Sequence, residues 1–202
     1  MTQYRFLATV VVLLLAPHSF SQTIAEPPAI TAQYTAISPT IDGDLTDEAW
    51  NEATPVTVFT QRELQEGAPA TERTEVRILY DSHALYIGLW CYDRSPDEII
   101  ANEVKRDFPY RAEDDFELIL DTYRDRRTGF LFIVNPNGAR YDALVTDEGE
   151  DINVDWNGLW EARAKITSEG WFAEIAIPFS TLRFPDDDTT RWGINFARHI
   201  RR

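Results

Sequence analysis

The sequence predicts an all-β fold, an antiparallel β-sandwich of jelly-roll type with only short helices. Three observations support this prediction. Apolar and polar residues alternate along many short segments, turn residues separate these segments at intervals typical of sandwiches, and neither segment that suits a helix is long enough to build a layer. Residues 41–202, about 160 in all, suit one domain that buries a sizeable core without disulfides.

Two segments precede this predicted domain. Arg5, an apolar run over residues 6–16 and small residues around Ser19 are typical of a secretory signal peptide, which we expect over residues 1–21. The proline-containing segment 22–40 is expected to form a linker or an edge strand. The protein is therefore expected to be exported, to the periplasm, the outer membrane or the extracellular space.

Strands are expected to make up most of the domain, because segments with a repeat of two recur along it. Asp81-Ser82-His83 and Ser168-Glu169-Gly170 link neighbouring strands into hairpins, and Asn135-Pro136-Asn137-Gly138 is typical of a chain reversal. The apolar run 129–134 is typical of a central strand. Strands are predicted over residues 75–80, 85–92, 115–121, 129–134, 140–146, 160–166, 171–177 and 192–200.

Two short helices are predicted between these strands. The first covers residues 46–53, with Thr46 as its N-cap, and the second covers residues 95–101, with Ser95 as its N-cap and Pro96 at its first position. Four tryptophans share faces with apolar residues, so we expect them in the core, where large aromatic side chains dominate. These are Trp50, Trp160, Trp171 and Trp192.

Composition restricts the partners of the protein. The 34 acidic and 19 basic residues give a formal net charge of -15, which repels the phosphates of nucleic acids and anionic lipid headgroups. Neutral ligands and cations remain, and no nucleic acid is expected as a partner. Cys91 is the single cysteine, so an internal disulfide is excluded.

An acidic stretch, residues 147–155, is a candidate calcium site. It offers several carboxylates close together in sequence, and calcium prefers such oxygen ligands. The alternative is a solvated charged loop, since the stretch lacks the order of an EF-hand. The candidate ligands are Asp147, Glu150, Asp151 and Asp155.

The sequence has few features of a catalytic site. Asp114, Asp115 and Glu117 form a carboxylate cluster, and residues two apart on a strand face lie about 6.6 Å from each other, close to glycosidase separations. Such neighbours point the same way, however, whereas a glycosidase pair flanks the scissile bond. Metalloprotease, nucleophile-elbow and phosphate-loop motifs are missing from the sequence. We therefore expect no enzymatic activity in this chain.

A set of ordered phrases resembles family 9 carbohydrate-binding modules, in the form found at the front of bacterial outer-membrane proteins that end in a β-barrel. The resemblance covers residues 41–202. The phrases are Ile41-Asp42-Gly43 through Trp50, Val76-Arg77-Ile78-Leu79-Tyr80-Asp81 with Leu85-Tyr86, Asp114-Asp115-Phe116-Glu117-Leu118, Gly170-Trp171 with Glu174 and Ile177-Pro178, and Gly193-Ile194-Asn195-Phe196.

The resemblance implies a β-sandwich that holds sugar ends between aromatic rings, with calcium elsewhere and glycan-degrading modules nearby. Glu117 matches the family carboxylate that binds sugar hydroxyls. Tyr110 and Arg111 stand where the family places a stacking tryptophan, and Ile133 stands where an arginine is expected. A second stacking tryptophan is expected beyond Arg202, in a longer protein.

Two aromatic residues are further candidates for sugar contact. Trp90 shares a strand face with Tyr86 and Tyr92, which predicts either a flat sugar platform or a second buried face. Trp156 follows the acidic stretch in a loop. The predicted function is non-catalytic glycan binding linked to polysaccharide catabolism. The alternatives are a docking domain for a downstream β-barrel and, less favoured, an activity associated with glycoside hydrolases.

Overall fold

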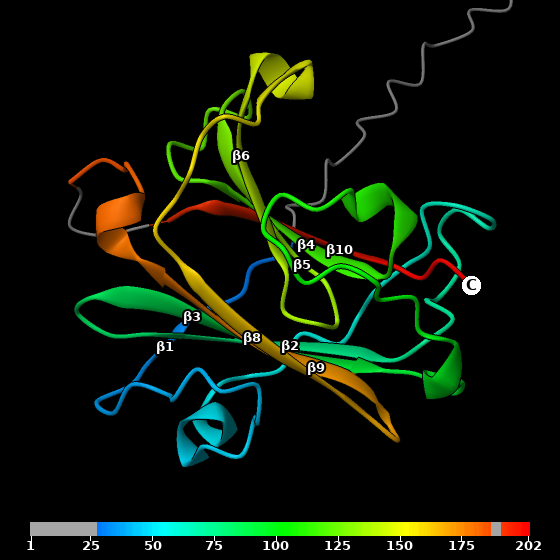
Figure 1. Cartoon of the computed structure of the whole chain (residues 1–202). Helices are drawn as coiled ribbons and strands as arrows, with labels where there is room; N and C mark the ends of the chain where they lie inside the picture. The colour runs from blue at the N-terminus through cyan, green and yellow to red at the C-terminus, as the bar shows by residue number, and fades with distance from the viewer. Residues whose placement is uncertain (1–27, 187–190) are drawn as a thin grey trace, which may run out of the picture.

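A computed structural model describes residues 28–186 and 191–202, so the predicted signal peptide at 1–21 lies outside the described residues. Within them, two five-stranded sheets pack face to face (Figure 1). The prediction of an antiparallel β-sandwich is confirmed: every strand pair is antiparallel except the short edge pair of β1 with β2.

Each sheet combines strands from distant parts of the chain. The first sheet has the order β1 (Gln33–Tyr34), β2 (Thr74–Tyr80), β3 (Ala84–Tyr92), β9 (Gly170–Pro178) and β8 (Glu161–Thr167). The second sheet has the order β10 (Gly193–His199), β4 (Asp115–Asp121), β5 (Gly129–Val134), β6 (Arg140–Thr146) and β7 (Asp151–Asn153). β7 was missed because its residues belong to the acidic stretch, which has little strand pattern.

The main core lies between the sheets and follows the predicted alternation. Inward residues such as Ile87 on β3, Phe116 on β4 and Ile175 on β9 are at most 1% exposed. Trp50, Trp160 and Trp171 are buried as predicted, and Trp192 packs half-buried against this core. Cys91 is free and buried, and burial raises the pKa of its thiol to about 12.

The predicted turns are confirmed and show why particular residues occupy them. Asp81 Oδ1 accepts the backbone N–H groups of His83 and Ala84 at 2.6 and 2.9 Å, which closes the β2–β3 hairpin. Gly138 adopts a φ of +77° in the turn before β6. Gly170 has a φ of +139°, and a Cβ there would overlap the Cys91 carbonyl oxygen, so only glycine fits.

The predicted helices are short 3-10 turns. η1 spans Glu48–Glu52 and η2 spans Pro96–Glu98. The predicted N-cap Thr46 is wrong, because Asp47 occupies that position; Ser95 does precede η2, but neither residue makes a side-chain cap bond. Other turns are η3 (Tyr110–Ala112), η4 (Asp147–Gly149) and η5 (Phe179–Thr181). None of the helices in the described residues has the length and apolar character to cross a membrane.

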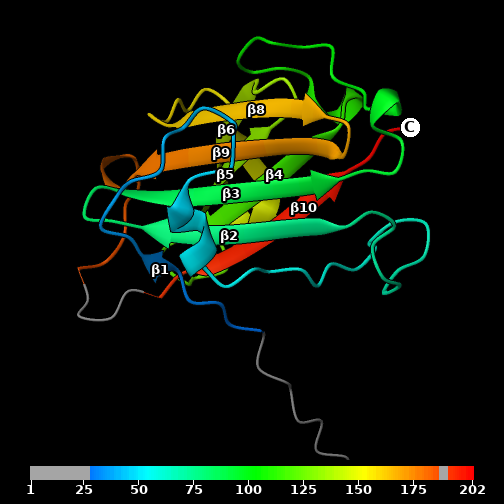
Figure 2. The same cartoon turned by 90° about the horizontal axis from the view of Figure 1, so that it is seen from below.

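The outer face of the first sheet is covered by the segment that carries η1 (Figure 2). Glu174 on β9 is fully buried there, and its carboxylate accepts hydrogen bonds from Trp50 Nε1 at 2.9 Å and from the backbone N–H groups of Asp42 and Gly43 at 3.0 and 2.9 Å. The phrases around Trp50 and around Glu174, far apart in sequence, are thus one structural unit.

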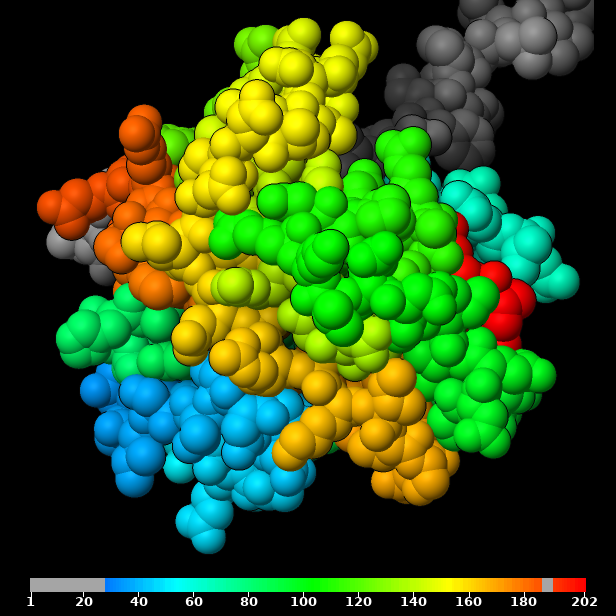
Figure 3. Space-filling view, in the orientation of Figure 1, coloured from blue at the N-terminus to red at the C-terminus, as the bar shows by residue number. Residues whose placement is uncertain are grey.

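The outer face of the second sheet is partly covered by residues 101–114. Phe108 from this loop is 3% exposed and packs with Ile133 and its neighbours. Glu113 accepts the backbone N–H groups of Asn102 and Glu103 and the Asn135 side-chain amide, which fixes the loop to the turn before β6. In Figure 3 this green segment lies on the surface next to the red C-terminal residues.

Candidate functional site

The outer face of the second sheet brings two carboxylates and an imidazole together. β10 pairs with β4 so that His199 stands opposite Asp115, and Glu117 lies two residues farther along the same face. His199 Nδ1 is 2.7 Å from Asp115 Oδ1 and 3.7 Å from Glu117 Oε1. Among the described residues, this is the group of histidine and carboxylate side chains whose ligand atoms all lie within 4.8 Å of one another.

Burial sets the electrostatics of this cluster. Asp115 is fully buried, while the side chains of Glu117 and His199 are 25% and 29% exposed. Burial raises the pKa of both carboxyls, because it disfavours their charged form, and the nearby imidazole opposes this effect. The hydrogen bond to Asp115 raises the pKa of His199. The cluster therefore favours a bound positive charge at the imidazole position.

Two arginines, Arg201 and Arg111, lie near this cluster. Arg201 follows β10, and its Nη2 lies 4.0 Å from Asp115 Oδ2. Arg111 on η3 is exposed and lowers the pKa of Glu117 through its charge. Ile133, expected to stand in place of a family arginine, is the fully buried cross-strand neighbour of Glu117 on β5. The cationic partners of Glu117 thus come from β10 and η3 instead of β5.

An aromatic pair lies on the same face as the cluster, on the other side of Ile133. Tyr110 on η3 and Tyr141 on β6 are both half-buried, with ring centroids 4.8 Å apart and ring planes at 53°. The Arg111 guanidinium lies 5.8 Å from the centroid of the Tyr110 ring. The structure therefore brings together three of the predicted sugar-binding residues, Tyr110, Arg111 and Glu117, on one face of the second sheet.

The other two predicted sugar-binding residues lie elsewhere. Trp90 is on the outer face of the first sheet, where its ring meets Trp50 edge-on at 6.2 Å and the Arg77 guanidinium lies 5.1 Å from its centroid. Trp156 packs half-buried against Phe130 and Phe132 at the margin of the main core. A role in binding stays a prediction for both tryptophans, at positions separate from Glu117.

The acidic stretch forms the turn η4, the strand β7 and the residues directly after it. Its four candidate calcium ligands are exposed, and they do not converge within the distance that unites the Asp115 cluster in the described part of the chain. Asp147 pairs with Arg127 at 3.4 Å, and Asp151 Oδ2 accepts a hydrogen bond from Thr146 Oγ1 at 3.1 Å. Calcium binding by Asp147, Glu150, Asp151 and Asp155 stays a prediction.

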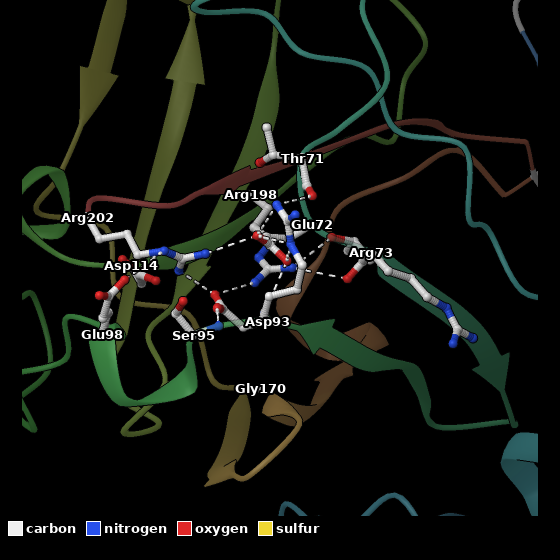
Figure 4. A network of polar contacts seen from close by, with 12 residues as sticks. Thr71, Glu72, Arg73, Asp93, Ser95, Glu98, Asp114, Gly170, Arg198 and Arg202 are labelled. Atoms are coloured by element: carbon white, nitrogen blue, oxygen red, sulfur yellow. Dashed lines mark hydrogen bonds and ion pairs between the residues drawn. The ribbon is translucent and has the colours of Figure 1, made fainter.

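Asp114 does not belong to the cluster that the sequence suggested, because successive strand residues point to opposite faces. Its Oδ1 accepts the backbone N–H of Arg201 at 2.9 Å. Its side chain is drawn in Figure 4 within a polar network in which Arg202 Nη1 contacts Asp93 Oδ2 at 2.6 Å and Arg202 Nη2 contacts Glu72 Oε1 at 3.0 Å. This network holds the C-terminal residues against the ends of β2 and β3.

Sequence reasoning missed three residues of the candidate site: His199, Arg201 and Tyr141. His199 was recognised as a strand residue, and its alternation along β10 was the available signal. Its meeting with Asp115 depends on the pairing of β10 with β4, which joins segments 84 residues apart. That pairing leaves no local pattern in the sequence.

Comparisons with known proteins agree with this architecture. The model of the family described as "Carbohydrate family 9 binding domain-like" matches residues 41–199. Among curated protein sequences, none matches the chain.

Solved structures share the fold at low sequence identity. Two are structures of a carbohydrate-binding module of family 9 from Caldicellulosiruptor kristjanssonii, one in complex with cellotriose and one with glucose. They are 21% identical, with TM-scores of 0.57 and 0.58, and the match covers 82% of this chain and 75% or 74% of theirs. A protein from Bacteroides uniformis has a TM-score of 0.65 at 11% identity, over 84% of this chain and 83% of its own.

Proposed function

Since the chain belongs to the carbohydrate family 9 binding domain-like family, we propose that it binds oligo- or polysaccharides through the outer face of its second sheet. The family is one of binding domains, so the chain is a binding module and not an enzyme. The observation that carries the proposed location is that Glu117, Tyr110, Tyr141 and Arg111 share one face of the second sheet.

The chemistry of this face suits a sugar. A carboxylate and a guanidinium can bind hydroxyl groups through charge-assisted hydrogen bonds, and tyrosine rings offer apolar contact to a pyranose face. The two family 9 modules of similar fold were solved with cellotriose and glucose. We therefore place cellulose-derived oligosaccharides first among the ligands of this chain, with xylan and chitin fragments next.

The test is calorimetric titration of the chain with oligosaccharides of cellulose, xylan and chitin. Saturable heat that is lost in Glu117→Ala supports the proposed site. The matched control is Glu63→Ala, which removes an exposed carboxylate from the loop before β2. Saturable heat that survives in Glu117→Ala would move the site elsewhere, with Trp90 and Trp156 as the next positions to substitute.

A docking role is the second candidate. The rings of Tyr110 and Tyr141 contact each other, and the buried Ile133 stands opposite Glu117 in place of an arginine, so this face has fewer sugar-binding groups than the family pattern implies. A domain that packs on a downstream β-barrel of the same polypeptide needs no free sugar. No heat with any oligosaccharide, together with co-purification of the domain with such a barrel, would favour this second function.

The wider context of the proposal is an exported protein of polysaccharide catabolism, in the periplasm, at the outer membrane or outside the cell. It rests on the signal-peptide pattern of residues 1–21 and on the family. Expression in a bacterial host with N-terminal sequencing of the exported product tests it, and a product that retains Met1 in the cytoplasm would contradict it. A chelator-dependent fall in melting temperature, abolished by Asp151→Ala, tests the predicted calcium site.

A further inference from the structure

We propose that Asp115, Glu117 and His199 bind a divalent transition-metal ion such as Zn²⁺. Their ligand atoms all lie within 4.8 Å of one another. Tetrahedral ligands at roughly 2.0–2.2 Å from one zinc lie about 3.4 Å from one another. The 2.7 and 3.7 Å distances from His199 Nδ1 to the two carboxylates lie on either side of this value, so side-chain shifts that open the contact between His199 and Asp115 would complete the site.

The donor set selects the kind of ion. Calcium and magnesium prefer oxygen ligands, whereas an imidazole beside two carboxylates suits zinc and neighbouring transition metals. Two carboxylates also balance a divalent charge. The site therefore differs in both place and chemistry from the calcium site predicted in the β6–β7 hairpin.

A second observation points to a ligand at the same place. Asp115 is fully buried, and its Oδ2 has no hydrogen-bond partner; the Arg201 guanidinium stays 4.0 Å from this oxygen. A buried carboxylate oxygen without a partner is costly. A protonated His199 between the two carboxylates explains the contact to Asp115 Oδ1 but leaves Oδ2 unsatisfied. A metal ion on the cluster can engage this oxygen.

The cluster is open to solvent on one side. Arg201 Nε donates to the Glu113 carbonyl at 3.4 Å and its backbone N–H donates to Asp114, which anchors this arginine next to the cluster. The partly exposed sides of Glu117 and His199 face solvent. Three protein ligands leave a coordination position on zinc for water or another oxygen donor. On the proposed function, which this last step needs, that donor is a sugar hydroxyl.

The decisive experiment is titration of the metal-free chain with ZnCl₂, followed by calorimetry. We expect one ion per chain. His199→Ala and Glu117→Gln should each weaken Zn²⁺ binding by more than the roughly 10–100-fold that loss of an outer-shell partner costs. His83→Ala is the matched control, because His83 is exposed on the β2–β3 turn and should not change the affinity. No binding, or binding that His199→Ala leaves unchanged, would overturn the proposal.

A measurement on the unsubstituted chain covers the case in which a variant fails to fold. Zn²⁺ should shift the imidazole nitrogen resonance of His199 and leave that of His83 in place. A shift of His83 alone would assign the binding to an adventitious surface site and overturn the proposal.

Oligosaccharide titrations with Zn²⁺ and with EDTA separate the metal site from the proposed function. Zn²⁺ binding without any glycan binding leaves the metal site standing and removes the proposed function. Glycan binding by a chain that takes up no Zn²⁺ supports the proposed function and removes the metal site. Glycan binding that is strengthened by Zn²⁺ supports both.

Discussion

Asp114 directly precedes β4 and Asp115 begins it; both are fully buried, yet their side chains lie on opposite faces of the second sheet. Asp114 faces the polar network of Figure 4, where burial raises the pKa of its carboxyl and the charges of Arg198 and Arg202 oppose this rise. Asp115 faces the outer surface, where its hydrogen-bond partner is His199. The two side chains are chemically identical and equally buried, and they differ in the residues around them.

The comparison shows that the role of a buried carboxylate depends on whether an arginine or a histidine lies beside it. Guanidinium groups stay charged at any ordinary pH, so the arginine pairs of this network do not titrate, and they hold the chain end. Imidazole changes charge near neutrality and can exchange its proton for a metal ion. The Asp115 cluster is therefore the responsive region, and the Asp114 network is the structural one.

The largest effect, a loss of stability, is expected when the polar network of Figure 4 is broken. Asp93 is fully buried and contacts Arg202 at 2.6 Å and Arg198 at 3.5 Å. In Asp93→Ala both guanidiniums lose a carboxylate, and breaking a buried ion pair costs about 3–5 kcal/mol. Chemical denaturation should show this loss as a lower midpoint. The affinity of the folded fraction for oligosaccharides should stay unchanged. A parallel loss of affinity would show that the polar network and the Asp115 cluster do not act independently.

The next effect is expected at the cluster, in binding rather than in stability. A hydrogen bond to a charged group contributes about 1.5–3 kcal/mol, so Glu117→Ala should weaken oligosaccharide binding by roughly 10–100-fold. The free energy of unfolding should change by less than about 1 kcal/mol, because Glu117 is partly exposed and its nearest ion-pair contact is 3.7 Å long. Calorimetry and denaturation on the same sample check both parts. A loss of several kcal/mol in stability would make Glu117 a structural residue.

A smaller effect is expected in the pH dependence of stability, which should differ between the Asp115 cluster and the polar network. The hydrogen bond to Asp115 raises the pKa of His199 above its ordinary value of 6.5. This contact therefore stabilises the fold fully below about pH 6.5, and the stabilisation is lost as the pH rises through the raised pKa. Asp115, Glu117 and Arg201 are the charged groups around the imidazole.

The measurement is the denaturation midpoint against pH, with EDTA present to remove metal. The unsubstituted chain should lose stability as the pH rises above neutrality, and His199→Asn should flatten that part of the curve. Asp93→Ala should keep the slope, because its partners do not titrate in this range. An identical slope in His199→Asn would assign the pH dependence to other groups.

The smallest effect is expected at the rim of the network. Arg94 contacts Glu72 at 3.0 Å, but its own side chain is 78% exposed, and Arg202 contacts the same carboxylate at 3.0 Å. Arg94→Ala should leave the denaturation midpoint within experimental error, since exposed ion pairs contribute little. A clear fall would show that the structural region extends to the surface.

Most of the fold could be predicted because it depends on local patterns. Alternation along β3, β4 and β9 marks inward residues, and Gly138 and Gly170 mark turns that need a positive φ. Glu117, Tyr110 and Arg111 were found through the family resemblance. Trp90 could not be assigned, because the same face of β3 suits either an open platform or the cover that η1 provides.

By itself, the sequence determined the class of fold, its turns, and the carboxylates at the start of β4, which it grouped together. Only the tertiary structure decided what each carboxylate meets. Strand order is set by the burial of whole faces, and a residue at position 199 reaches position 115 only because β10 pairs with β4. The partners that give these carboxylates their roles come from distant segments, and no local propensity encodes such a meeting.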